Sequence, residues 1–85
     1  MGEEIIGVVI RYFTKAGVAA LEVTHDKISL GDTLKFKGHT TQFEITVSSM
    51  QKDNQAISEA KTGDLIGIKV PERVRENDTV IKVTP

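Results

Sequence analysis

The sequence contains no cysteine and no tryptophan, and it has only two prolines, one tyrosine and three phenylalanines. Without cysteine the chain forms no disulfide and no thiolate metal site, which fits a reducing compartment. The longest apolar runs are a few residues, far short of the ~20 that a membrane helix needs. The N-terminal stretch MGEEIIGVVI is acidic where a signal peptide is basic. These absences predict a cytoplasmic protein that does not interact with a membrane.

Charge is also nearly balanced, with a net charge of −1 and a pI of about 6.1. Broad electrostatic binding of nucleic acid usually shows as a domain pI above about 9. The composition therefore argues against such binding, although a local basic face is compatible with a balanced total. The 85 residues fit one domain, residues 1–85.

Runs of β-branched, aromatic and alternating residues predict an all-β fold. Residues 5–13 and 18–23 read as a hairpin around a turn at 14–17. Residues 33–37, 65–70 and 79–83 read as further strands, and residues 41–50 as one long strand. Pro71 ends the pairing of the strand before it, because proline lacks the N–H that a ladder needs.

The side chains that form the core follow from the alternation. Leu34 and Phe36 are expected to point inward, with the lysines beside them facing solvent. Phe13 and Phe43 are expected in the core as well. Tyr12 is then the only aromatic residue with a polar tip at the surface, which disfavours binding of nucleic acid by base stacking.

Residues 53–63 are ambiguous. Asp53 or Asn54 can cap a short helix that Gly63 ends. The alternative is an extended segment at residues 56–57 followed by a tight turn. Both interpretations stay open.

Three aspartates follow a residue that tolerates positive φ, in Gly31-Asp32, Gly63-Asp64 and Asn77-Asp78. The stretch 27–34 also resembles residues 73–80, so we expect the same turn to be built twice. Turn formation, rather than acid–base chemistry, is the interpretation that this pattern favours for the three aspartates.

The turns and strands follow the pattern of a known family, and the residues that carry it are Gly17–Val23, Gly31, Asp32, Lys35, Gly38, Val47, Met50 and Ala60–Ile68. Over about residues 7–83 the chain resembles the second domain of the translational GTPases, the β-barrel of elongation factor Tu and its archaeal and eukaryotic relatives. It is also similar to the C-terminal barrel of collagenase-like peptidases. The resemblance implies a small, six-stranded, closed antiparallel β-barrel of the translation-protein type.

The family's nucleotide chemistry is not expected here, because the chain has no G-x-x-x-x-G-K-[ST] loop to hold phosphates. In the elongation factors this barrel helps to hold the aminoacyl end of tRNA. The resemblance places Ser49, Lys52 and Leu65 at that pocket's polar positions, so the expected carboxylate and amide are missing. A pocket that loses its polar partners loses much of its selectivity.

No catalytic or metal-binding group is expected. His25 and His39 are the only histidines, and zinc wants about three or four clustered ligands. A nucleophile–base pair of Ser48 or Ser49 with His39 lacks an orienting third group. The sequence therefore predicts a protein that is not an enzyme and that binds no cofactor.

Five basic residues are the candidate nucleic-acid-binding set: Lys35, Lys37, Lys52, Arg73 and Arg75. The alternative is a solvated strand face that discourages edge pairing. The main functional hypothesis is a translation-factor-like module that binds tRNA or ribosomal RNA. The alternative hypothesis is a protein-interaction module, such as an accessory subunit of a collagenase-like peptidase.

Overall fold

Strands make up all the regular secondary structure of this protein, which we describe from a computed structural model covering residues 2–85. The all-β prediction is therefore confirmed. The ten strands are β1 (Gly2–Phe13), β2 (Val18–Val23), β3 (Lys27–Ser29), β4 (Thr33–Lys37), β5 (Gln42–Thr46), β6 (Met50–Lys52), β7 (Gln55–Ile57), β8 (Glu59–Lys61), β9 (Leu65–Lys69) and β10 (Thr79–Thr84). Within residues 2–85 the structure has no helix long and apolar enough to cross a membrane.

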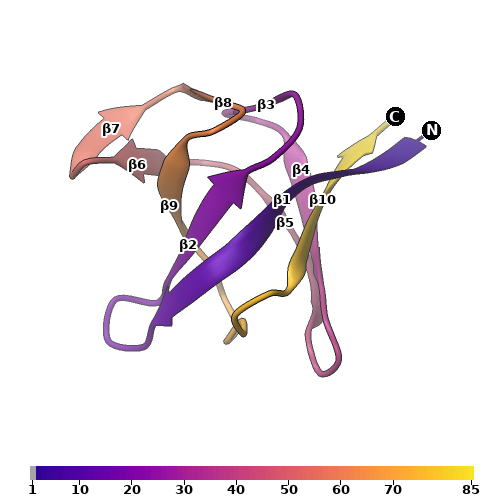
Figure 1. Ribbon diagram of the computed structural model, residues 1–85, viewed down its shortest axis with the longest axis vertical. Coiled ribbons are helices and arrows are strands. Elements are labelled where there is room, and N and C mark those ends of the chain that lie inside the picture. Colours follow the sequence, from indigo (N-terminus) through magenta and orange to yellow (C-terminus); the bar gives the residue numbers. More distant parts are fainter. Residues whose placement is uncertain (1) are drawn as a thin grey trace.

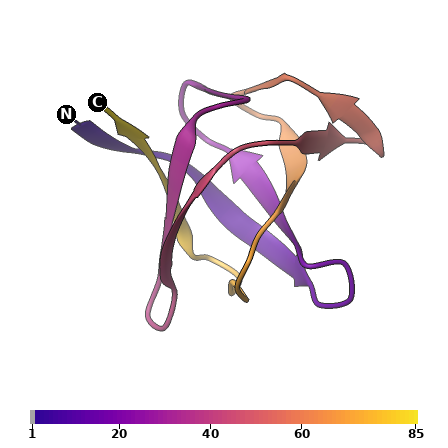
Figure 2. The same cartoon turned by 180° about the vertical axis from the view of Figure 1, so that it is seen from behind.

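Eight of these strands form one curled antiparallel sheet in the order β5-β4-β10-β1-β2-β9-β6-β7, and β3 and β8 form a separate ribbon. Figures 1 and 2 show the sheet wrapping around an interior, with the ribbon at one end. The fold is barrel-like, but the described part of the chain has no sheet that closes on itself. The expected six-stranded closed barrel is thus not found, because the ladder has two free ends, β5 and β7.

The expected long strand over residues 41–50 is wrong, because the chain changes its pairing partners part of the way along it. After β5, the backbone of Val47 pairs with the turn before β4: Gly31 N–H donates to Val47 O at 2.8 Å, and Val47 N–H donates to Asp32 O at 2.9 Å. The chain then leaves this path, and β6 pairs with β7 and β9 instead. One predicted strand is therefore two strands in different parts of the sheet.

The core lies inside the curl of the sheet. Leu34 and Phe36 are fully buried, as the alternation predicts, and the Phe36 ring stacks on Phe43 with centroids 5.0 Å apart. Burying a large apolar side chain stabilises a fold by about 1.5–3 kcal/mol. The fully buried side chains come from six strands of the curled sheet, from the ribbon and from two connections: Ile6, Val9, Leu21, Val23, Ile28, Leu34, Phe36, Val47, Met50, Ile68, Val74 and Val80.

Both ends of the curled sheet are covered. At one end the β3–β8 ribbon places Ile28 and its cross-strand partner Ala60 into the core, and both are buried. At the other end, residues 71–78 cross the opening and bury Val74. The ribbon and the connection each contribute apolar side chains to the core. The core is therefore enclosed although the sheet stays open.

The predicted aspartate turn is present, and it occurs three times rather than twice. In each copy the aspartate carboxylate accepts the N–H of the residue three positions earlier, at 2.8–2.9 Å. Gly31, Gly63 and Asn77 take positive φ values of 93°, 96° and 74°. The hydrogen bonds commit Asp32, Asp64 and Asp78 to turn formation, as the sequence indicates.

The second of two β-bulges in β1 overturns the expectation that Phe13 lies in the core. The register of β1 shifts around Ile6 against β10 and around Ile10 against β2. Each bulge inserts one residue and so reverses which side chains face inward. Beyond Ile10, Tyr12 therefore packs against the core while Phe13 faces solvent and is 47% exposed.

The ambiguity over residues 53–63 is resolved in favour of the extended alternative. Asp53 and Asn54 both have positive φ, 52° and 64°, and they join β6 to β7. Positive φ at both central residues is the hairpin geometry that Asn and Asp favour. The two residues that might have capped a helix form a hairpin turn instead, and β8 follows.

Candidate functional site

An apolar groove of about 270 Å³ lies on the outer face of the sheet. It runs across the β1–β2–β9 surface and under the turn between β6 and β7. Its lining residues are Phe13, Val18, Ala20, Gln51, Asp53, Asn54, Leu65, Ile66 and Gly67. We refer to it as the apolar groove.

Small side chains in register create the floor of this groove. Ala20 of β2 lies directly opposite Gly67 of β9, and Gly67 lies opposite Gln51 of β6. On the side of Ala20 away from Gly67, its cross-strand partner is Arg11 of β1. The row therefore has two nearly bare positions between two long side chains, so the sheet surface is hollowed there.

Exposed apolar side chains form the walls. Leu65 is 61% exposed and Phe13 is 47% exposed, although both are large. The Arg11 guanidinium lies 5.7 Å from the centre of the Phe13 ring, within the range of a cation–π contact. An exposed apolar patch with a polar rim is typical of a protein-interaction surface.

A close ion pair stands beside the groove. Lys52 Nζ donates to Asp64 Oδ1 at 2.9 Å. The Lys61 backbone N–H, and after it the Lys52 ammonium, hold the pKa of Asp64 below its ordinary value. The hydrogen bond and the charge of Asp64 raise the pKa of Lys52 in return. The resemblance places an aminoacyl pocket at Lys52 and Leu65, among other positions. Both are next to Asp64: Lys52 through this hydrogen bond, and Leu65 as the following residue in the chain.

These shifts give a prediction about acid. Because the folded-state pKa of Asp64 is lowered, its contribution to stability is present above the ordinary aspartate pKa of about 3.9 and is lost as pH falls through the folded value. Asp64→Asn is therefore expected to flatten the fall in the free energy of unfolding below about pH 5. Chemical denaturation over a pH series measures this slope.

Lys52→Gln is the matched control for the acid prediction. It keeps the Lys61 N–H bond, the larger cause of the Asp64 shift, so it should retain most of the acid dependence of the wild type. An Asp64→Asn protein with the same acid slope as the wild type would show that this turn does not hold a stabilising charge.

The structure does not bring the five predicted basic residues together. Lys35 lies 3.5 Å from Glu3, and Lys52 is paired with Asp64 near the β6–β7 hairpin. Arg73 and Arg75 are in the connection before β10, where Arg75 Nε donates to Thr40 Oγ1 at 3.1 Å. Lys37 is the last residue of β4 and directly precedes the loop that contains Thr40. The set is divided between the two ends of the curled sheet.

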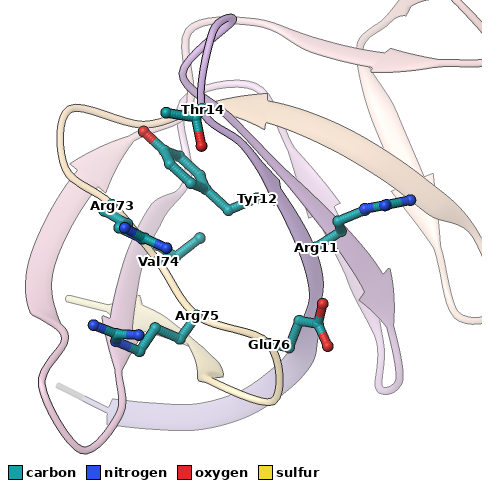
Figure 3. A pocket seen from close by; sticks show the side chains of 7 residues that line it. All are labelled: Arg11, Tyr12, Thr14, Arg73, Val74, Arg75 and Glu76. Carbon is teal, nitrogen blue, oxygen red and sulfur yellow. The ribbon is translucent and has the colours of Figure 1, made fainter.

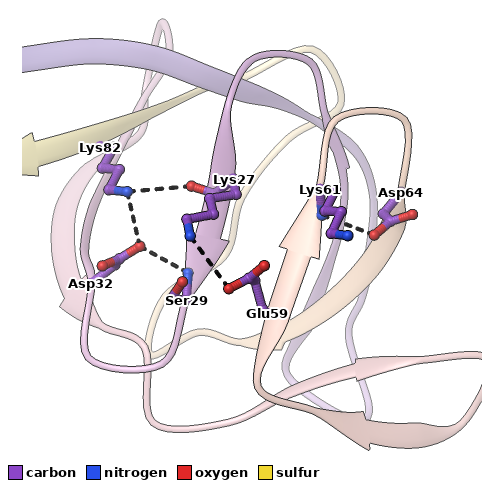
Figure 4. Close-up of polar contacts among 7 residues, drawn as sticks. All are labelled: Lys27, Ser29, Asp32, Glu59, Lys61, Asp64 and Lys82. Atoms are coloured by element: carbon purple, nitrogen blue, oxygen red, sulfur yellow. Dashed lines mark hydrogen bonds and ion pairs between the residues drawn. The ribbon is translucent and has the colours of Figure 1, made fainter.

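Other polar side chains are engaged in structural contacts. Lys82 Nζ bridges Asp32 Oδ2 and Lys27 O, both at 3.3 Å, and so ties β10 to the β3–β8 ribbon (Figure 4). Lys27 also pairs with Glu59 across the ribbon at 3.5 Å. His25 hydrogen-bonds to the Thr24 hydroxyl at 2.8 Å. Residues 2–85 contain no group of three or more histidine and acidic side chains placed to hold a metal ion.

The sequence reasoning missed the walls of the apolar groove. Phe13 was assigned to the core because strand alternation alone cannot locate a bulge. Leu65 begins a strand, and its parity with Gly67 and Lys69 was the available signal that it faces outward. Arg11 was also missed, although it alternates with Phe13 after the bulge.

Comparison with known proteins identifies both the fold and the relatives of this chain. The fold is that of the C-terminal domain of a Geobacillus thermoleovorans protein named as a U32 peptidase, with a TM-score of 0.87 over 95% of this chain and 93% of that domain. The sequence identity of that pair is 18%. The selenomethionine variant of the same domain gives a TM-score of 0.85.

Sequence comparison gives closer relatives. An uncharacterized protease of Methanocaldococcus jannaschii is 40% identical over 76 residues, covering 88% of this chain and 18% of the protease. A collagenase of Porphyromonas gingivalis is 32% identical over 78 residues, covering 91% of this chain and 22% of the collagenase. The chain thus spans about a fifth of the length of the curated relatives it matches. No family model matches the sequence.

The peptidase side of the resemblance is therefore supported by both sequence and fold. The elongation-factor side stays a prediction, and the closed translation-type barrel that it implies is not found among residues 2–85. The relatives are named as proteases, but the matched part is a small fraction of each of them.

Proposed function

We propose that this chain is a non-catalytic β-module that serves a collagenase-like peptidase of the U32 type as an accessory, protein-binding unit. The observation that carries the proposal is its similarity, over nearly its whole length, to about a fifth of two proteases, together with its fold match to a peptidase C-terminal domain. The remaining four fifths of such a relative would supply the catalytic part.

The surface of the chain supports a binding role. Asp32, Asp64 and Asp78 are held by turn hydrogen bonds, which favours a structural role for these three over acid–base chemistry. The apolar groove instead offers Phe13 and Leu65 at a hollowed surface. Exposed large apolar side chains around a pocket are the kind that anchor a protein interface. The body of the peptidase is the partner that we assign to this groove.

Leu65→Asp is expected to weaken binding of the chain to the collagenase-like peptidase of its own source organism by about tenfold or more, the loss typical of an interface anchor. A buried carboxylate in the contact would lack a partner, whereas the folded chain tolerates it because Leu65 is 61% exposed. Titration calorimetry with the purified peptidase measures the change.

Leu30→Asp is the matched control, since Leu30 is 44% exposed but lies in the turn before β4, outside the lining of the groove. This variant should bind like the wild type. A wild-type chain that does not bind the peptidase would overturn the proposed function. Equal losses in both variants would move the interface away from the groove.

RNA binding keeps less support than the peptidase association. The prediction relied on Lys35, Lys37, Lys52, Arg73 and Arg75, and two of these lysines are paired with carboxylates. The net charge of −1 also limits attraction to a polyanion. Partnership with tRNA or ribosomal RNA therefore remains a hypothesis.

A further inference from the structure

All three arginines of the chain line a single hollow. Arg11, Arg73 and Arg75 border a space of about 300 Å³ between the end of β1 and the connection 71–78, together with Tyr12, Thr14, Val74 and Glu76. We refer to it as the arginine hollow (Figure 3). It is distinct from the apolar groove, and Arg11 stands between the two, because its guanidinium lies over the ring of Phe13.

The backbone that carries two of these arginines is firmly held. Asn77 N–H donates to Val9 O at 2.8 Å, and Val9 N–H donates to Asp78 O at 2.9 Å. The Arg75 N–H is fixed by the Asp78 carboxylate at 2.9 Å. Val74, between the arginines, is buried in the core. Arg73 and Arg75 are therefore presented from an anchored connection rather than from a loose loop.

The arginines have no carboxylate partner among the described residues. Lys27, Lys35, Lys52 and Lys82 each form an ion pair with a carboxylate, whereas no ion pair within residues 2–85 involves an arginine. The polar partner of Arg75 is the neutral hydroxyl of Thr40. Guanidinium groups that lack a carboxylate partner retain their capacity to bind one.

Figure 3 shows how the side chains divide. Arg73 and Arg75 extend to the same side of the connection, while Arg11 and Glu76 lie on the other side. The Tyr12 hydroxyl is on the same side as Arg73 in this view. The pair Arg73 and Arg75, with a phenol nearby, is thus the part of the hollow best suited to a negatively charged ligand.

We infer that Arg73 and Arg75 bind carboxylate side chains of an acidic peptide segment. The inference deepens the proposed function and rests on it for the source of the segment, a protein partner. A guanidinium donates two parallel N–H groups that match the two oxygens of a carboxylate, which gives both strength and orientation. Arg73 and Arg75, two residues apart on an anchored connection, can therefore each bind one carboxylate in this way.

The observations favour a peptide over a nucleic acid. Glu72 and Glu76 flank the arginines in the same connection, and they repel a dense line of phosphates. The hollow is short, and Tyr12 beside it is half-buried against the core, which limits base stacking. Isolated carboxylates on a peptide can approach Arg73 and Arg75 while avoiding these glutamates.

The test is fluorescence anisotropy of the full chain with a labelled peptide of alternating glutamate and glycine. The same peptide with glutamine and an oligouridine of equal length serve as comparison ligands. We expect the glutamate peptide to bind and the glutamine peptide not to bind. Arg73→Gln with Arg75→Gln should weaken binding roughly tenfold or more, the loss expected when charge-assisted hydrogen bonds are removed.

Two further variants separate geometry from charge. Lys27→Gln with Lys61→Gln removes the same charge from the ribbon at the opposite end of the fold, and it should bind like the wild type. Arg73→Lys with Arg75→Lys keeps the charge but loses the paired N–H donors of the guanidinium group, so this variant should bind the glutamate peptide more weakly than the wild type. Arg73→Gln alone, at an exposed side chain, keeps the test valid if the double variant does not fold.

Each outcome bears on the inference. No binding of the glutamate peptide by the wild type, or an equal loss in the lysine variant, would overturn it. Tighter binding of oligouridine, lost with the same arginines, would replace the peptide by RNA. Peptidase binding that survives the arginine changes would leave the proposed function intact while removing this site from it.

Discussion

Gly38→Ala is expected to destabilise the protein by about 3 kcal/mol, which corresponds to a fall of about 12–24 °C in Tm for a domain of this size. A Cβ atom at Gly38 would overlap the carboxylate of Asp78. That carboxylate cannot simply move away, because it holds the Arg75 N–H at 2.9 Å and is nearly buried. Thermal unfolding followed by circular dichroism measures the loss.

Gly67→Ala is the matched control for Gly38. Its added Cβ would meet the Val18 Cγ1 atom at 3.2 Å, and a side-chain methyl group can shift where an anchored carboxylate cannot. We therefore expect a loss much smaller than that of Gly38→Ala. Asp78→Ala should itself destabilise the turn, and Gly38→Ala should add little in that background because the overlapping atoms are gone. Additive losses would contradict this explanation of Gly38.

The elements that the sequence predicts best depend on contacts between near neighbours in the chain. The β1–β2 hairpin, the alternation of Leu34 and Phe36, and the aspartate turns are each determined within a few residues. Gly31 and Asn77 were recognisable because few other residues take positive φ without strain. Local chemistry is sufficient for such features, so one sequence reveals them.

The features that the sequence could not reveal depend on pairing between distant strands. The break after β5 arises because Val47 pairs with Gly31 and Asp32, which lie well before it in the chain. The bulges at Ile6 and Ile10 are visible only against β10 and β2. Neither leaves a signal in the alternation itself, and both are needed to find the open ladder and the exposed side of Phe13.

The candidate sites follow the same division. The sequence indicates Arg73 and Arg75 as a small basic cluster, and in the structure both line a hollow. Arg11 joins them through the bulge in β1. The floor of the apolar groove, Ala20 opposite Gly67, exists only because β2 and β9 pair in that register. A site assembled from four strands cannot be read from any one of them.

The largest single loss is expected from Phe36→Ala. Phe36 is fully buried, and its ring stacks on Phe43 at a centroid distance of 5.0 Å with the planes 14° apart. Removing a buried phenylalanine costs about 3–5 kcal/mol through lost burial and the cavity that remains. At roughly 0.05–0.15 kcal/mol per residue, the whole fold is worth about 4–13 kcal/mol. The variant should therefore lose a large part of its stability and unfold at a clearly lower guanidinium concentration than the wild type.

Guanidinium denaturation followed by circular dichroism tests this expectation, with Phe43→Ala as the control. Phe43 lies on the edge strand β5 and is only half-buried, so its loss should be clearly smaller. The comparison also separates core from interface: Phe36→Ala should reduce peptidase binding in proportion to the unfolded fraction, whereas Leu65→Asp should reduce it in a folded protein. A Phe36→Ala protein as stable as Phe43→Ala would contradict the greater contribution assigned to the fully buried ring of Phe36.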